Sequence, residues 1–145
     1  MALINSILLV DDEDLFHLVF EDACSMLDIS LSLQCVESAD RAAGFFSKWK
    51  EHPEMRPDCM FVDLNVVGSS FDGIELIRKL REEVGEDMVA GMISSSSDPA
   101  EQERAREAGA QFWIVKSHQI EPRLERFRDE FQGHKGNSIP FRVYD

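Results

Sequence analysis

Residues 7–12 read ILLVDD, so four apolar residues run directly into two carboxylates. A short, uninterrupted apolar run predicts a strand that is buried on both faces of a parallel sheet. A second run, residues 59–62, ends in the same way at Asp63. Because open α/β sheets bind ligands beyond the carboxyl ends of their strands, we expect Asp11, Asp12 and Asp63 to meet at that edge.

Two later apolar runs also end at polar side chains. Residues 89–93 lead into Ser94 and Ser95, and residues 112–115 lead into Lys116. The register of the fourth strand favours Ser94 over the serines that follow it. We therefore expect three acids, a hydroxyl and an ammonium to share one rim of the sheet.

Segments with helical periodicity lie between the apolar runs, a pattern typical of βαβ units around a parallel sheet. We predict five helices, the first of which opens after Asp14 as a candidate N-cap. The helix near residues 99–108 has only alanines at its apolar positions, so we expect it to be the most mobile. The strands are expected at residues 6–10, 31–37, 59–62, 89–93 and 112–115.

The strand-end residues, together with DGIELIRKLR at residues 72–81 and Gly109-Ala110 before the last strand, resemble the receiver domain of two-component response regulators. The resemblance runs from Ile7 to Phe131, and it depends on the joint order of acid pair, central acid, hydroxyl and lysine. It implies a flavodoxin-like α/β fold, with a doubly wound, five-stranded parallel sheet in the order 2-1-3-4-5 and five helices.

The composition changes after residue 132, where glycine, asparagine, serine and proline become frequent. We expect the receiver domain to occupy residues 1–132 and residues 133–145 to form a flexible C-terminal tail. A docking segment built on Phe141, Val143 and Tyr144 is the alternative.

Three carboxylates close together repel one another unless a cation or protons intervene. Mg²⁺ relieves this repulsion, because it is commonly held by one or two carboxylates together with phosphate oxygens. The resemblance implies that Asp12 and Asp63 bind Mg²⁺ directly, Asp11 through water, and Asn65 through its backbone carbonyl. It also implies that Asp63 accepts a phosphoryl group from a phosphohistidine on a histidine kinase or a histidine phosphotransfer protein.

The oxygens of the transferred group need neutralising partners, because phosphoryl transfer depends mainly on positioning and charge. We assign this role to Lys116 and, by resemblance, to Ser94 with Ser95 beside it. Trp113 takes the place of a Tyr or Phe that turns inward in the family's switch, and its larger ring makes that rotation harder. Ser117 replaces a usual proline, so we predict a trans Lys116–Ser117 bond, because a cis bond without proline costs about 2.5–4 kcal/mol.

The composition limits the possible partners and locations. The chain has 145 residues, the size of one domain, and 28 acids against 15 Lys and Arg give a formal net charge of −13. Without a basic stripe, direct nucleic-acid binding is not expected. No segment reads as a membrane span or signal peptide, and the three cysteines lack metal-ligand spacing, so we expect a cytoplasmic monomer or weak dimer.

These features favour a stand-alone receiver, a phosphorylation-dependent switch that catalyses only its own phosphorylation and dephosphorylation and is not otherwise an enzyme. Its expected readout face for a downstream protein consists of the helix at residues 99–108, the last strand and the last helix. A pseudo-receiver, which keeps the fold without the chemistry, is one alternative. The other is a haloacid-dehalogenase-like phosphatase, but such enzymes need an acid two residues after the nucleophile, where this chain has Asn65.

Overall fold

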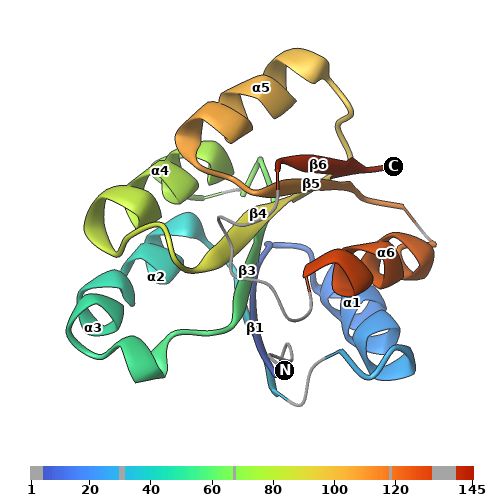
Figure 1. Cartoon of the computed structure of the whole chain (residues 1–145), viewed down its shortest axis with the longest axis horizontal. Helices are drawn as coiled ribbons and strands as arrows, with labels where there is room; N and C mark the ends of the chain where they lie inside the picture. Colours follow the sequence, from blue (N-terminus) through green and yellow to red (C-terminus); the bar gives the residue numbers. More distant parts are fainter. Residues whose placement is uncertain (1–4, 30–31, 67, 118, 132–139) are drawn as a thin grey trace.

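The computed structural model describes residues 5–29, 32–66, 68–117, 119–131 and 140–145. Within these residues, strands and helices alternate along the chain (Figure 1). The elements are β1 (Ser6–Val10), α1 (Asp14–Met26), β2 (Ser32–Val36), α2 (Ala39–Ala43), α3 (Phe46–Glu51), the 3₁₀ helix η1 (Pro53–Met55), β3 (Cys59–Val62), α4 (Gly73–Glu83), β4 (Val89–Ser94), α5 (Pro99–Ala108), β5 (Phe112–Val115), α6 (Glu121–Phe131) and β6 (Arg142–Tyr144).

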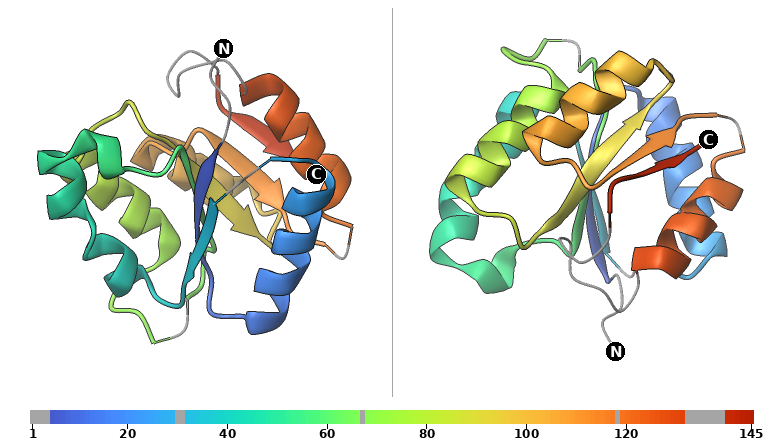
Figure 2. Two further views of the ribbon diagram at one scale, coloured as in Figure 1. Left: turned by 90° about the horizontal axis from the view of Figure 1, so that it is seen from below. Right: turned by 45° about the horizontal axis from the view of Figure 1, so that its top comes forward.

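The described strands form one parallel sheet with the order β2-β1-β3-β4-β5-β6. Its first five strands follow the predicted order, so the doubly wound, flavodoxin-like fold is confirmed. Helices α2 to α5 cover one face of the sheet, and α1 and α6 cover the other (Figure 2). Strand β3 is buried along its whole length, as its apolar run predicts.

Side chains that alternate along the strands divide the core into two clusters. Leu8 and Met60 belong to the cluster under α2 to α5. Ile7, Phe61 and Phe112 belong to the cluster under α1 and α6, which also contains the phenylalanines of α6. Each face of the sheet therefore has its own apolar layer, as expected for a parallel sheet with helices on both sides.

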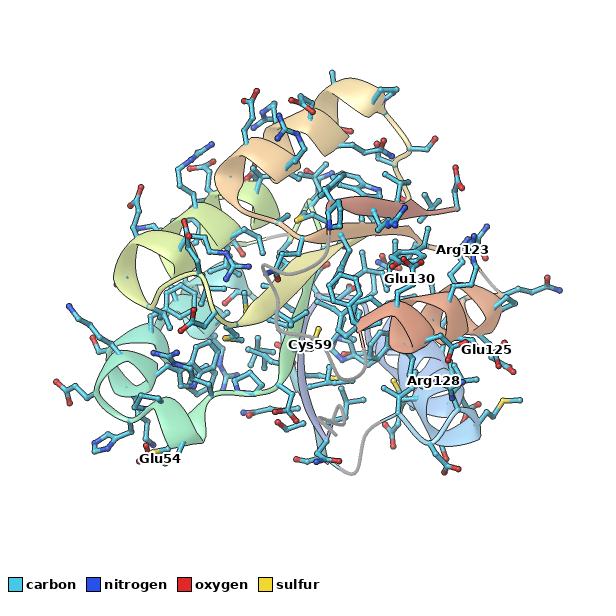
Figure 3. The ribbon with its side chains drawn as sticks, viewed as in Figure 1. Glu54, Cys59, Arg123, Glu125, Arg128 and Glu130 are labelled. Carbon is cyan, nitrogen blue, oxygen red and sulfur yellow. The ribbon has the colours of Figure 1, made fainter. Side chains whose placement is uncertain are left out.

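Residues 133–139 of the predicted flexible tail lie outside the described residues, and the described residues 140–145 differ from that prediction. Residues Arg142–Tyr144 form β6, which pairs in parallel with β5. Tyr144 is only 2% exposed, and its ring meets that of Phe127 edge-on with centroids 6.1 Å apart. Arg142 Nε lies 3.2 Å from Oε2 of Glu130, which α6 directs toward β6 (Figure 3). An aromatic contact and an ion pair thus hold a sixth strand to the sheet.

Two helices differ in detail from their predictions. The helix predicted between the second and third strands is split into two. Helix α2 ends at Ala43, and α3 begins at Phe46. Helix α1 already includes Asp14, and its N-cap residue is Glu13, so the prediction of Asp14 as the N-cap is wrong by one residue. None of the helices in the described parts of the chain is both long and apolar enough to cross a membrane.

Candidate functional site

Asp11, Asp12 and Asp63 come together at the carboxyl edge of the sheet. One carboxylate oxygen from each lies within 4.8 Å of the other two. Asp11 follows β1 and Asp63 follows β3, and the register places the last residues of these strands, Val10 and Val62, side by side. Asp11 and Asp63 are buried, whereas Asp12 is half-buried. The structure thus brings the three predicted acids to one place.

The backbone around Asp63 is fixed by its neighbours. The Asp63 N–H donates to the carbonyl of Val10 at 2.9 Å, and the Asp11 N–H donates to the carbonyl of Val36 at 3.0 Å. The start of α4 packs so closely against β3 that a Cβ on Gly73 would lie 2.2 Å from the carbonyl oxygen of Asp63. Only glycine permits this approach, so α4 holds the position of Asp63.

Lys116 reaches the acids from the end of β5. Its Nζ lies 2.8 Å from Asp11 Oδ2, 3.0 Å from Glu13 Oε1 and 3.3 Å from Asp63 Oδ2. The ammonium also lies 4.3 Å from the centroid of the Phe16 ring, a cation–π contact. The peptide bonds of the described residues are all trans, so the prediction for the bond after Lys116 is confirmed. The lysine therefore stands beside the candidate acceptor and neutralises part of the acid cluster.

The electrostatics of the site follow from burial and from these contacts. Burial raises the pKa of Asp63 to about 6; Lys116 opposes this effect, and the negative charge of Asp11 adds to it. Burial of the Lys116 ammonium lowers its pKa, but the contact with Asp11 and the charge of Asp63 outweigh burial, and the pKa is raised overall. The negative charges of the acid cluster therefore stabilise the protonated lysine, and the lysine in turn stabilises the ionised Asp63.

The predicted switch residues Ser94 and Trp113 lie on β4 and β5, and Ser95 directly follows β4. Ser94 is buried at the end of β4, the strand between those that lead to Asp63 and Lys116, and its Oγ accepts from the Ser96 N–H at 3.2 Å. Ser95 is exposed. Trp113 is fully buried, and its Nε1–H donates to the carbonyl of Ser96 at 3.0 Å. Trp113 therefore ties the loop after β4 to β5.

Asn65 lies in the loop after β3, where its side chain is exposed. Its proposed contribution is a backbone carbonyl, and this role stays a prediction. The phosphoryl-binding roles of Ser94 and Ser95 and the switching role of Trp113 also remain predictions.

Three residues of α1 and its N-cap belong to the site, although no role there was predicted for them. Glu13 is a fourth carboxylate, and its N–H donates to Asp11 Oδ1 at 2.9 Å. Phe16 belongs to the core under α1 and α6, and its ring also contacts the lysine. His17 Nε2 lies 2.5 Å from the carbonyl oxygen of Asp11. These three residues lie within six positions of the acid pair in the sequence, and this closeness was the one indication that they could belong to the site.

The sequence model of the family described as response regulator receiver domain matches residues 7–127. This chain belongs to that family. A receiver domain is a signalling domain that accepts a phosphoryl group, so the predicted function class is confirmed at this level. A comparison with curated proteins gives no match.

Solved structures show the same receiver fold. The phosphorylated cyanobacterial phytochrome response regulator RcpA is 17% identical with a TM-score of 0.70, and the match covers 88% of this chain and 93% of RcpA. A response regulator from Thermotoga maritima is 24% identical with a TM-score of 0.68, covering 88% and 97%. The Mn²⁺-bound form of the response regulator Rcp1 is 17% identical with a TM-score of 0.69, covering 89% and 95%. At these identities the likeness is one of fold.

Proposed function

We propose that this receiver domain accepts a phosphoryl group on Asp63 from a phosphohistidine donor, in a Mg²⁺-dependent reaction, and thereby switches the binding of a downstream protein. The observation that carries the proposal is the setting of Asp63. Lys116 Nζ lies 3.3 Å from its Oδ2, and the carboxylates of Asp11 and Asp12 lie within 4.8 Å. A nucleophile between a cation and two metal-binding acids is the arrangement that phosphoryl transfer needs, because the reaction depends on positioning and charge neutralisation.

The acid cluster suits a divalent cation. Asp11 Oδ2 is buried and makes no hydrogen bond of suitable geometry in the described part of the chain, although Lys116 Nζ lies 2.8 Å away. We assign Asp12 and Asp63 as direct ligands of Mg²⁺, Asp11 as a ligand through water, and Asn65 as a ligand through its carbonyl. Bound Mg²⁺ would neutralise charge on the phosphoryl oxygens. Rcp1, which shares the fold, has a Mn²⁺-bound form, and this supports the assignment.

Asp63 supplies the attacking oxygen. An O–P bond forms as the P–N bond of the phosphohistidine breaks, and the electron pair of that bond returns to the imidazole ring. With a pKa of about 6, the carboxyl group is mostly ionised at neutral pH and is ready to attack. Lys116 and the Ser94 hydroxyl then contact the phosphoryl oxygens and hold the product.

The donor protein must dock beside the acid rim, and α1 offers an apolar surface there. Leu15 and Leu18, in the first two turns of α1, are 73% and 63% exposed. A groove of about 480 Å³ continues this surface between α1 and the start of α6, where Val19 and Ile120 line it. Exposed leucines beside a reaction site favour contact with a protein, so we assign this surface to the histidine kinase or phosphotransfer protein.

We assign the readout to the face formed by α5, β5 and α6. The hydrogen bond from Trp113 to Ser96 links β5 to the loop that follows Ser94. A movement of Ser94 toward a phosphoryl group on Asp63 would therefore displace this loop and alter the face, which is how a local change of charge biases a two-state element.

Incubation with a small-molecule phosphodonor and Mg²⁺, followed by mass spectrometry of the intact protein, tests the proposal. We expect one phosphoryl group on the wild type, and none on Asp63→Asn or in the presence of EDTA. Labelling of Asp63→Asn would assign the nucleophile elsewhere, and an unlabelled wild type would indicate a pseudo-receiver. Sustained release of phosphate from unrelated phosphomonoesters would favour a haloacid-dehalogenase-like phosphatase.

A further inference from the structure

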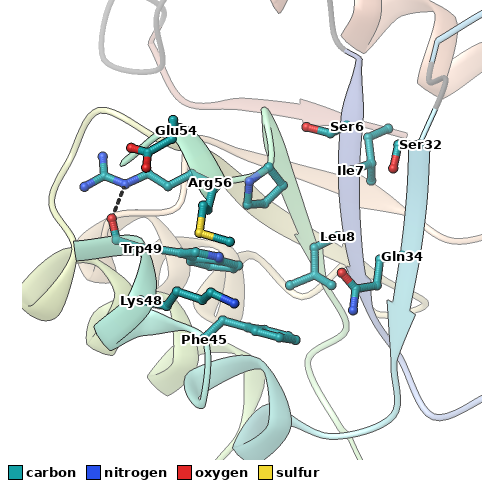
Figure 4. Close-up of a pocket in the computed structure, with 12 residues that line it drawn as sticks. Ser6, Ile7, Leu8, Ser32, Gln34, Phe45, Lys48, Trp49, Glu54 and Arg56 are labelled. Carbon is teal, nitrogen blue, oxygen red and sulfur yellow. Dashed lines mark hydrogen bonds between the residues drawn. The ribbon is translucent and has the colours of Figure 1, made fainter. Parts of the chain in front are cut away.

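A cavity of about 380 Å³ lies at the amino edge of the sheet, between β1 and β2 on one side and α3 and η1 on the other (Figure 4). Ser6 and Ser32, the first residues of β1 and β2, line it. Asp11 and Asp63 follow the last residues of their strands, at the opposite edge. The cavity is therefore separate from the phosphorylation site.

The sequence of β2 explains why this corner of the sheet is not filled. Leu33 and Cys35 pack against the core under α1 and α6, so Ser32 and Gln34 face the other side of the sheet, where both are exposed. The connection that would cover them is split into α2 and α3, which are five and six residues long. The polar side chains of Ser32 and Gln34 and the break between α2 and α3 leave this corner of the sheet open.

The walls of the cavity are held in place by contacts within the protein. The rings of Phe45 and Trp49 are stacked, with centroids 5.6 Å apart and an angle of 14° between their planes. Arg56 Nε donates to the carbonyl of Trp49 at 3.0 Å and so ties η1 to α3. Leu8 adds an apolar floor from β1. Phe45 is half-buried and Trp49 is only 4% exposed, so the cavity presents one side of the Phe45 ring and a small part of the Trp49 indole, both held in place before any ligand binds.

Two polar groups face each other across this space. Lys48 reaches from α3 toward the β1–β2 side, where Gln34 lies (Figure 4). Within the described residues, no carboxylate oxygen lies within ion-pair distance of the Lys48 ammonium. The lining holds Lys48 and Arg56 against one acid, Glu54, in a chain whose net charge is −13. The cavity is therefore a locally cationic place on an acidic protein.

We propose that this cavity binds a small aromatic carboxylate, with its ring against the half-buried Phe45 ring, at the exposed part of the Trp49 indole, and its carboxylate on the Lys48 ammonium. The amide N–H₂ of Gln34 donates a second hydrogen bond to the carboxylate. The volume lies in the range of about 300–1,000 Å³ that holds small organic ligands. An apolar wall that orients a ring and one charged donor that selects an anion are the two elements such recognition requires.

Titration of the 145-residue protein with biphenyl carboxylate, followed by the two indole N–H signals in ¹H–¹⁵N NMR spectra, tests the proposal. Trp49 lines the cavity with the small exposed part of its indole, whereas Trp113 is fully buried in β5 outside the lining and serves as the internal reference. We expect the Trp49 signal to shift in a saturable way while the Trp113 signal stays in place. An unmoved Trp49 signal, or equal shifts of both signals, would overturn the proposal.

A matched pair of variants tests the charge. Lys48→Met removes the ammonium from the cavity, and Lys50→Met removes an exposed ammonium from the same helix outside the lining. Lys48→Met should weaken binding of biphenyl carboxylate about tenfold, whereas Lys50→Met should leave it unchanged. The neutral biphenyl carboxamide should bind both variants equally. Equal losses of carboxylate affinity in the two variants would show that only the overall charge of the protein matters and would refute a specific site.

Discussion

Replacement of the proposed acceptor, Asp63→Asn, should stabilise the metal-free protein at neutral pH. Burial and nearby acids raise the pKa of Asp63 from 3.8 to about 6 against the opposing effect of Lys116. Because the folded state holds this proton more tightly than the unfolded chain, ionisation of Asp63 lowers the free energy of unfolding as pH rises from 3.8 to about 6, and the loss is complete above that range. Such a difference in pKa corresponds to at most about 3 kcal/mol, which the substitution would recover.

Urea unfolding in EDTA measures this gain. At pH 8 we expect Asp63→Asn to raise the free energy of unfolding by up to about 3 kcal/mol. At pH 5, just above the sequence pI of about 4.6, the gain should fall to about half. Glu83→Gln removes an exposed acid from α4 and is the matched control for net charge. A gain that is equal at both pH values, or no larger than that of the control, would refute the reasoning.

Three further substitutions test other parts of the structure. Tyr144→Ala should lower the free energy of unfolding, measured in urea, by about 3 kcal/mol. Val143→Ala, at a position that is 37% exposed, should lower it by less than about 1 kcal/mol. Similar losses in the two variants would mean that Tyr144 does not anchor β6. Leu18→Ser should slow transfer from a histidine phosphotransfer protein about tenfold without changing labelling by a small phosphodonor, and an equal loss with both donors would exclude a docking role. Gly73→Ala places a Cβ 2.2 Å from the carbonyl oxygen of the acceptor aspartate. It should therefore lower the free energy of unfolding by about 1–3 kcal/mol and slow labelling by the small phosphodonor. Unchanged unfolding and labelling would show that α4 can move away from β3 at little cost.

The position of the acid rim could be predicted because its signal is local. A buried parallel strand needs an apolar run, and the residue that follows the run is delivered to the carboxyl edge whatever the rest of the fold does. The same rule places Ser94 and Lys116 at the carboxyl edge of the sheet. It thus predicts that the acids, the hydroxyl and the ammonium follow one another along the chain, each at the end of a strand. The strand order itself came from the resemblance to receiver domains, and the structure confirms it.

The remaining features depend on contacts between distant residues. The three residues of β6 are too few to show a period, and Tyr144 becomes buried only because α6 presents Phe127 to it. Glu13 is next to the acid pair in sequence, but its contact with Lys116 spans 103 residues. The cavity beside Trp49 exists because a short, split connection leaves polar residues of β2 uncovered, and no single segment carries that information.

The sixth strand changes which part of the molecule forms the border of the sheet. Strand β5 reads FWIV, and an unpaired edge of that composition is a template for pairing with other chains. With β6 in place, the border is a three-residue strand that starts with an arginine, and shortness and charge are both features by which natural sheet edges resist association. A downstream protein must therefore read this face through side chains or first displace β6. Shortening the chain before residue 140 would expose the apolar strand, and self-association rather than unfolding is the failure to expect.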